Sequence, residues 1–185
     1  MIFRTVYWMI RSRFFSSPLG LHEVGRIRMR ARLTDIDVLK HINNGMYLSL
    51  MDLGRVDLLV RAGTWQRLQR LGYYPVVGSA TMTYRKSITW RQAFTLETRI
   101  VGYDERAVYV EQRFVVDGEI AARGIMQGRF LKRTGGTVSM RELGEALGVD
   151  VTTSPVPEWV RRWADDARLP SGRTPTPSVW DDGAS

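Results

Sequence analysis

Hydrophobic and polar residues alternate strictly over residues 26–33, where every second position is an arginine. A period of two residues predicts a half-buried strand whose other face is cationic and solvated. From Gly45 to Ala62 the apolar residues instead recur at helical spacing and cover nearly the whole circumference of the predicted helix. A helix that is apolar all round must be enclosed by other parts of the protein. A shorter helical turn is expected over 64–71.

Four more segments with the two-residue period follow Pro75. Asp117 and Gly118 separate the last two, and this dipeptide is typical of a tight hairpin. The predicted strands are 76–88, 94–103, 107–116 and 119–132. A sheet with one apolar face needs a cover, and the long apolar helix can supply it. We therefore expect an α+β fold in which an antiparallel sheet of about five strands wraps around one long central helix.

The rest of the chain is predicted to form extensions of this domain. Ser139 and Glu142 form a capping box for one C-terminal helix, and Ser154 is a candidate cap for a second. The last residues are rich in Pro, Ser, Gly and Thr, a composition typical of disorder. We expect an N-terminal amphipathic segment at 1–20 and the sheet domain at 21–133. A helical extension at 134–169 and a disordered tail at 170–185 follow.

The N-terminal segment, residues 1–20, is apolar and aromatic, with three arginines and no acidic residue. Three interpretations stay open. The segment is a helix lying on a membrane surface, an arginine-rich targeting segment, or a terminal helix docked on the protein. Arg11 and Arg13 interrupt the apolar run, which argues against a secretory signal.

Composition and charge exclude several functional classes. The net charge is +8, and residues 1–33 carry most of it, with seven arginines and one acidic residue. Such a balance suits an anionic partner, but no nucleic-acid-binding motif accompanies it, so nucleic acid is not an expected partner. The chain has no cysteine and two histidines. This excludes a disulfide scaffold, a cysteine nucleophile and a multi-histidine metal site, so no metal is expected.

Polar residues concentrate just before the long helix, at Asp35, Asp37, His41, Asn43 and Asn44. A carboxylate beside a helix N-terminus can act as a base or nucleophile, while free backbone N–H groups stabilise an oxyanion. The same residue types also cap helices by satisfying those N–H groups. From the spacing alone, the capping interpretation is favoured.

The segment TDIDVLKHINNGMY, residues 34–47, resembles the D-x-D-x-x-x-H-x-N-N-x-x-Y signature of hotdog-fold acyl-CoA thioesterases in the 4-hydroxybenzoyl-CoA thioesterase-like branch. Residues 101–114 resemble the third and fourth strands of the thioesterase-superfamily-member-six-like group. The resemblance covers about residues 20–133. It implies a hotdog fold, a homodimer or homotetramer, and hydrolysis of an acyl-CoA or acyl-carrier thioester. No cofactor is implied, since coenzyme A is part of the substrate.

The resemblance also implies roles for individual residues. Asp37 matches the catalytic carboxylate, which acts as base or nucleophile. Gly45 and Met46, at the helix start, would offer N–H groups to the thioester carbonyl. The remaining motif positions shape the loop or border the acyl site: His41, Asn43, Asn44 and Tyr47. A structural role is favoured for three of the motif residues. Asp35 is expected to form a turn or cap, His41 to be a hydrogen-bonded loop residue, and Tyr47 to pack in the core.

Other positions complete the candidate site. Many family members have a small residue or glycine just before the motif histidine, where this chain has Lys40. Other hotdog thioesterases carry their carboxylate on the helix, which makes Asp52 the reserve candidate, because Asp57 is expected to pair with Arg61. Cations that could contact the coenzyme A phosphates are Arg85, Lys86 and Arg91.

Three alternatives to hydrolysis remain. The first is a non-catalytic hotdog protein that binds acyl-CoA or lipid and associates with a membrane through residues 1–20. The second is a hotdog dehydratase, although the motif resembles the thioesterase type. The third, nucleic-acid binding, predicts affinity that falls steeply with salt. The expected location is the cytoplasm, or the periphery of a membrane if residues 1–20 bind lipid.

Overall fold

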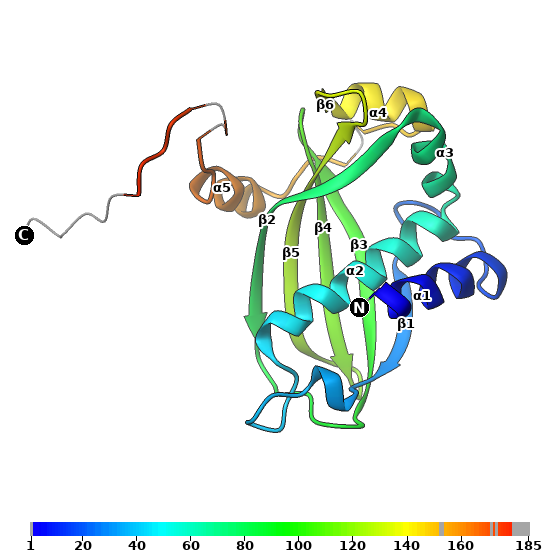
Figure 1. Cartoon of the computed structure of the whole chain (residues 1–185), viewed down its shortest axis with the longest axis vertical. Helices are drawn as coiled ribbons and strands as arrows, with labels where there is room; N and C mark the ends of the chain where they lie inside the picture. Colours follow the sequence, from blue (N-terminus) through cyan, green and yellow to red (C-terminus); the bar gives the residue numbers. More distant parts are fainter. Residues whose placement is uncertain (1, 152–153, 171, 173, 179–185) are drawn as a thin grey trace, which may run out of the picture.

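The computed structural model describes residues 2–151, 154–170, 172 and 174–178. Figure 1 shows a curled antiparallel sheet wrapped around one long helix, α2. Neighbouring strands lie in the order β1-β3-β4-β5-β2, and a short β6 pairs with β5. The strands are β1 (Gly25–Arg30), β2 (Tyr73–Tyr84), β3 (Ala93–Tyr103), β4 (Val108–Val116), β5 (Glu119–Lys132) and β6 (Thr137–Val138). This is the hotdog fold, as predicted.

Six helical segments accompany the sheet in the described part of the chain. They are α1 (Ile2–Phe14), the 3-10 turn η1 (Leu33–Asp35), α2 (Asn44–Arg61), α3 (Thr64–Leu71), α4 (Met140–Leu147) and α5 (Glu158–Asp166). The Ser139 cap is confirmed, because its hydroxyl accepts the Glu142 N–H at 3.1 Å. The Ser154 cap is wrong, because α5 starts after Pro157. The Ser154 carbonyl instead accepts the Tyr103 N–H, which holds this segment extended along the end of β3.

The strand boundaries of β1 and β2 differ most from the prediction, and β2 ends at Tyr84 rather than at residue 88. β2 begins at Tyr73 and contains Pro75, which an edge strand tolerates because one side of its backbone needs no partner. β1 ends at Arg30, and the chain turns into η1 at Leu33. The hairpin at Asp117 and Gly118 is confirmed, since both residues have positive φ, at 49° and 81°.

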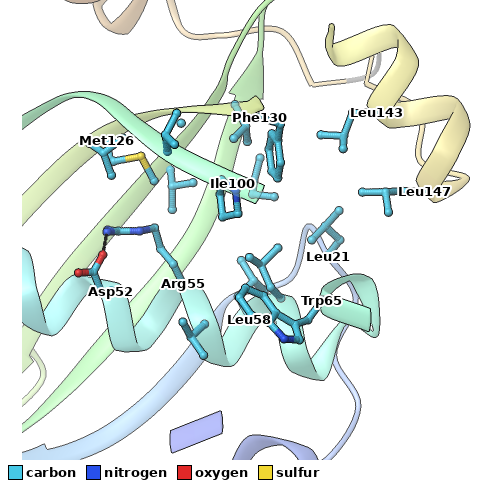
Figure 2. A pocket seen from close by; sticks show the side chains of 18 of the residues that line it. Leu21, Asp52, Arg55, Leu58, Trp65, Ile100, Met126, Phe130, Leu143 and Leu147 are labelled. Carbon is cyan, nitrogen blue, oxygen red and sulfur yellow. Dashed lines mark hydrogen bonds and ion pairs between the residues drawn. The ribbon is translucent and has the colours of Figure 1, made fainter. Parts of the chain in front are cut away.

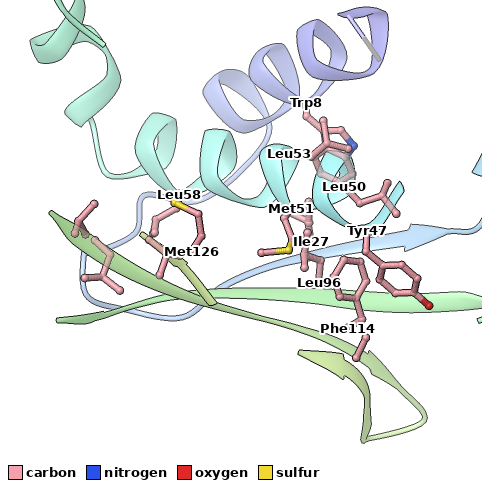
Figure 3. Close-up of a cluster of buried hydrophobic side chains, with 14 of the residues drawn as sticks. Trp8, Ile27, Tyr47, Leu50, Met51, Leu53, Leu58, Leu96, Phe114 and Met126 are labelled. Carbon is pink, nitrogen blue, oxygen red and sulfur yellow. The ribbon is translucent and has the colours of Figure 1, made fainter. Parts of the chain in front are cut away.

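The core lies between α2 and the concave face of the sheet. Leu50, Met51 and Leu53 of α2 are fully buried, and Figure 3 shows this part of the helix facing Leu96 and Phe114 of the sheet. Farther along the helix, side chains of α4 lie opposite the C-terminal half of α2 (Figure 2). The predicted enclosure of an all-round apolar helix is therefore confirmed.

A glycine sets the distance between α2 and the sheet. A Cβ atom at Gly54 would lie 2.4 Å from the Thr98 hydroxyl oxygen and 2.8 Å from the Gln112 amide nitrogen. Real Cβ atoms do not approach other atoms so closely, so only glycine lets the helix pack at this depth.

The N-terminal helix α1 packs along the outer side of α2. Trp8 is buried there, Arg4 forms a 2.8 Å ion pair with buried Asp35, and the Ser12 hydroxyl donates to Asp57 at 2.6 Å. Residues 2–14 thus form a docked helix. Its outer face remains apolar and exposed in this chain, and Phe3 is 92% exposed.

No helix among the described residues is long and apolar enough to span a membrane. The disorder predicted for 170–185 falls largely outside the described residues.

Candidate functional site

The motif residues form a tight loop between η1 and α2. Ile36 pairs with Ile42, the Asp37 N–H donates to the His41 carbonyl at 3.0 Å, and the Lys40 N–H donates to the Asp37 carbonyl at 3.0 Å. Lys40 closes this turn with a φ of 62°, in the left-handed region that favours glycine. A glycine, which the resemblance leads one to expect at this position, would adopt this φ without the steric cost that Lys40 bears. The turn also brings the backbones of Asp37 and His41 side by side.

The Asp37 carboxylate faces His41 at the edge of this loop. One carboxylate oxygen accepts the Leu39 N–H at 2.9 Å and lies 3.6 Å from His41 Nδ1. The Asp37 side chain is 20% exposed, so it is held in place yet reaches solvent. A carboxylate in this position can take a proton from water or attack an electrophile directly.

The three predicted phosphate-binding cations lie on the segment beside the motif loop. Ile42 donates its N–H to the Ile88 carbonyl at 2.8 Å, which ties this segment to the loop. Two of the cations, Arg85 and Lys86, form ion pairs with Glu119, and Lys86 lowers the pKa of that carboxyl. The third, Arg91, stacks on Trp90 with its guanidinium carbon 5.6 Å from the ring centre. All three cations are exposed.

The α2 N-terminus is capped from within the chain. The Asn43 side chain accepts the Gly45 N–H at 2.9 Å, and the Asn43 carbonyl accepts the Met46 N–H at 2.9 Å. The two amides that the resemblance suggests as oxyanion donors therefore already have acceptors in this structure. A substrate carbonyl could reach the Gly45 amide only after the Asn43 side chain rotates away. Asn44 lies next to the cap, and its carbonyl accepts the Tyr84 hydroxyl at 3.1 Å.

Two motif residues have the structural roles expected of them. Asp35 is buried, and besides Arg4 it accepts the Arg32 N–H at 3.0 Å, which fixes the turn before the loop. Tyr47 is buried against Phe114, with ring centres 4.8 Å apart, and burial raises the pKa of the Tyr47 hydroxyl. Sequence analysis missed that Asp35 also anchors α1, because its partner Arg4 is far away in the sequence.

The carboxylates on α2 both have partners. Asp57 pairs with Arg61 at 3.2 Å, as expected, and also accepts the Ser12 hydroxyl. Asp52 pairs with Arg55. The helix carboxylates are thus bound to arginines, whereas Asp37 faces an imidazole.

A second region lies along α2, where sequence analysis named only the reserve candidate Asp52. A cavity of about 330 Å³ opens there between the helix, the sheet and α4, and Figure 2 shows Asp52 and Arg55 at one end of the drawn side chains. The sequence signal that could have found it is Arg55, an arginine on a helix whose other faces are apolar.

A buried hydrogen-bond chain fixes Arg55. Its guanidinium donates to the Gln112 side-chain oxygen at 2.7 Å. The Gln112 amide nitrogen in turn donates to the Met51 carbonyl and the Thr98 hydroxyl, both at 2.9 Å. Burial lowers the pKa of Arg55, and the charge of Asp52 opposes that change. No group of three or more His, Asp or Glu side chains in the described ranges could hold a metal ion.

Comparisons with known proteins agree with this fold. A family model described as the Thioesterase-like superfamily matches residues 31–164. Protein THEM6 of Danio rerio is 41% identical over 118 residues, covering 62% of this chain and 58% of that protein. The chain thus spans less than two thirds of the length of this curated relative.

Solved structures share the fold at low sequence identity. The probable thioesterase YbaW of Escherichia coli superposes with a TM-score of 0.62 at 20% identity, covering 66% of this chain and 95% of that one. A putative oleoyl thioesterase of Lactobacillus plantarum superposes with a TM-score of 0.65 at 16% identity, covering 89% of this chain and 58% of that one.

Proposed function

This chain belongs to the thioesterase-like superfamily, and we propose that it hydrolyses an acyl thioester, such as an acyl-CoA, to a free acid and a thiol. The observation that carries this proposal is the placement of Asp37. Its carboxylate is partly exposed, accepts the Leu39 N–H and lies 3.6 Å from His41 Nδ1, at the loop that leads into α2.

Two chemical routes are available to Asp37. As a general base, it takes a proton from water, and the resulting hydroxide adds to the carbonyl carbon. The carbon–sulfur bond then breaks, and the leaving sulfur takes the proton from Asp37 to depart as the thiol. As a nucleophile, it displaces the thiol and forms an anhydride, which water then opens. Single-turnover hydrolysis in water labelled with heavy oxygen tests the second route. Label enters the Asp37 carboxylate only when water opens an anhydride at the Asp37 carbon, so labelled Asp37 would establish the nucleophilic route.

The coenzyme A portion would bind at the same end of the sheet. Exposed Arg85, Lys86 and Arg91 lie on the segment joined to the motif loop, and cations are needed to hold its phosphates. A second copy would pair along β2, because this edge strand exposes Val77 and Tyr84 and leaves one side of its backbone unpaired within the sheet.

The test is thiol release from short, medium, long and aromatic acyl-CoAs, followed with a thiol-reactive dye. The chain has no cysteine, so it contributes no background. Asp37→Asn keeps an oxygen for the Leu39 N–H but removes the carboxylate, and it should lower turnover by about 10²-fold or more. Asp117→Asn is the matched control, because Asn fits the exposed hairpin position equally well. Full turnover by Asp37→Asn would refute the mechanism.

A non-catalytic function is the second candidate. Two observations favour it: Asn43 occupies the amides at the start of α2, and α1 carries an exposed apolar face. In this case the protein binds acyl-CoA or lipid without turning it over. Saturable acyl-CoA binding with no thiol release from any member of the panel would establish it in place of hydrolysis.

A further inference from the structure

The cavity along the C-terminal half of α2 has an apolar wall built from elements that are far apart in the sequence. Its side chains come from the loop before β1, from α2 and α3, from the sheet and from α4 (Figure 2). Among them are Leu21, Leu58, Trp65, Ile100, Phe130 and Leu143. Its volume of about 330 Å³ lies at the lower end of the range for small-ligand pockets, roughly 300–1,000 Å³. A single apolar chain is therefore a better match in size than a two-chain lipid.

One charged pair lines this cavity among the residues that the structure describes. Arg55 is the buried member, with a side chain only 16% exposed, whereas the Asp52 side chain is 60% exposed. Gln112 holds the guanidinium from the core side, so Arg55 keeps its position whatever Asp52 does. Asp52 can leave the pair by rotating into solvent, but Arg55 cannot.

We propose that this cavity binds a single-chain aliphatic carboxylate, whose carboxylate pairs with Arg55 and whose chain lies against the apolar wall. The bound carboxylate replaces Asp52, which turns to solvent, so the guanidinium remains paired with one negative charge throughout. An amphipathic anion suits the site because burying a cation beside an apolar cavity is costly unless an anion accompanies it.

The proposed site is separate from the motif loop. Asp52 follows the first residue of α2, Asn44, by eight positions, which corresponds to about 12 Å along a helix that rises 1.5 Å per residue. The proposal therefore does not depend on thioester hydrolysis, and it stands or falls on binding alone.

The experiment is calorimetric titration of the full chain with decanoate, and with decanol as the neutral ligand of equal chain length. We expect decanoate to bind several-fold more tightly than decanol, because its carboxylate pairs with the buried guanidinium while the largely exposed Asp52 turns to solvent. Arg55→Met should remove this advantage. Asp52→Asn should act in the opposite direction and tighten decanoate binding several-fold, because it removes the competing carboxylate, while leaving decanol unaffected.

Three results would overturn the proposal. The first is no decanoate binding up to millimolar concentration. The second is equal affinity for decanoate and decanol, which would identify a purely apolar pocket. The third is weaker decanoate binding by Asp52→Asn. Because Asp52 is largely exposed, that variant remains informative even if Arg55→Met does not fold. Leu59→Trp, at a half-buried lining position, should fill the cavity and weaken both ligands together, which places binding inside it.

Discussion

The two ends of α2 show two ways of building a site. At the N-terminal end, the motif loop places Asp37 beside His41 through hydrogen bonds between residues at most four apart. At the other end, the cavity around Arg55 is assembled from segments that begin before β1 and end in α4. A local site leaves a motif in the sequence, whereas an assembled site exists only once the chain has folded.

The motif loop is anchored by the buried ion pair between Asp35 and Arg4 of α1. Breaking this pair should have the largest effect on stability. Arg4→Met leaves the Asp35 carboxylate buried without its partner, which should lower the free energy of unfolding by about 3 to 5 kcal/mol. Urea denaturation measures the change. Arg13→Met, at an exposed position of the same helix, should change it by less than about 0.5 kcal/mol. Equal stability of the two variants would show that α1 does not anchor the loop.

Two glycines of α2 compare its N-terminal end with its middle. Gly54→Ala places a Cβ against Thr98 and Gln112 and should cost about 1 to 3 kcal/mol of stability. The new Cβ of Gly45→Ala would contact only the end of the Asn43 side chain, at 3.3 Å. This substitution should therefore leave the stability nearly unchanged. Thermal unfolding of both variants checks this difference. A neutral Gly54→Ala would mean that α2 packs less closely on the sheet than described.

The outer face of α1 should bind anionic lipid weakly. Its exposed aromatic residues and Arg13 suit an interface with acidic headgroups. Replacing Phe3 and Phe14 with serine together should reduce co-sedimentation with phosphatidylserine vesicles about tenfold, without changing thermal stability. Equal sedimentation of the variant and the natural sequence would rule out this face as the lipid contact.

The smallest expected effect concerns the cations beside the motif loop. Arg85→Ala and Lys86→Ala together should raise KM for an acyl-CoA several-fold, and the difference should shrink as salt screens the phosphates. Arg133→Ala, an exposed arginine after the end of β5, serves as the distant control. A KM unchanged at low salt would place the coenzyme A phosphates elsewhere.

Most of the fold was predictable because its determinants are local. The periods of two and 3.6 residues located the five long strands and the enclosed helix α2. The position of α1 was left open, because it depends on Arg4 meeting Asp35 across 31 residues. The Ser154 cap failed for the same kind of reason, since pairing of this segment with Tyr103 holds it extended.

The candidate site, too, was predictable only where its determinants are local. The motif pointed to Asp37 and His41, and the structure places them together. The spacing favoured a capping role for the polar residues before α2, and the structure confirms it for Asn43. The motif pointed instead to an oxyanion site, because a cap and an oxyanion site use the same N–H groups. The motif could not reveal the cavity, whose lining residues have no common spacing.

The most direct test compares Asp37, the carboxylate of the motif loop, with Asp52, the carboxylate that lines the cavity. Thiol release by Asp37→Asn and Asp52→Asn should be measured side by side on the best acyl-CoA of the panel. We predict that the loss in Asp37→Asn exceeds the loss in Asp52→Asn by at least tenfold, because catalysis belongs to the motif loop. A larger loss in Asp52→Asn would move the chemistry to the cavity and contradict the account.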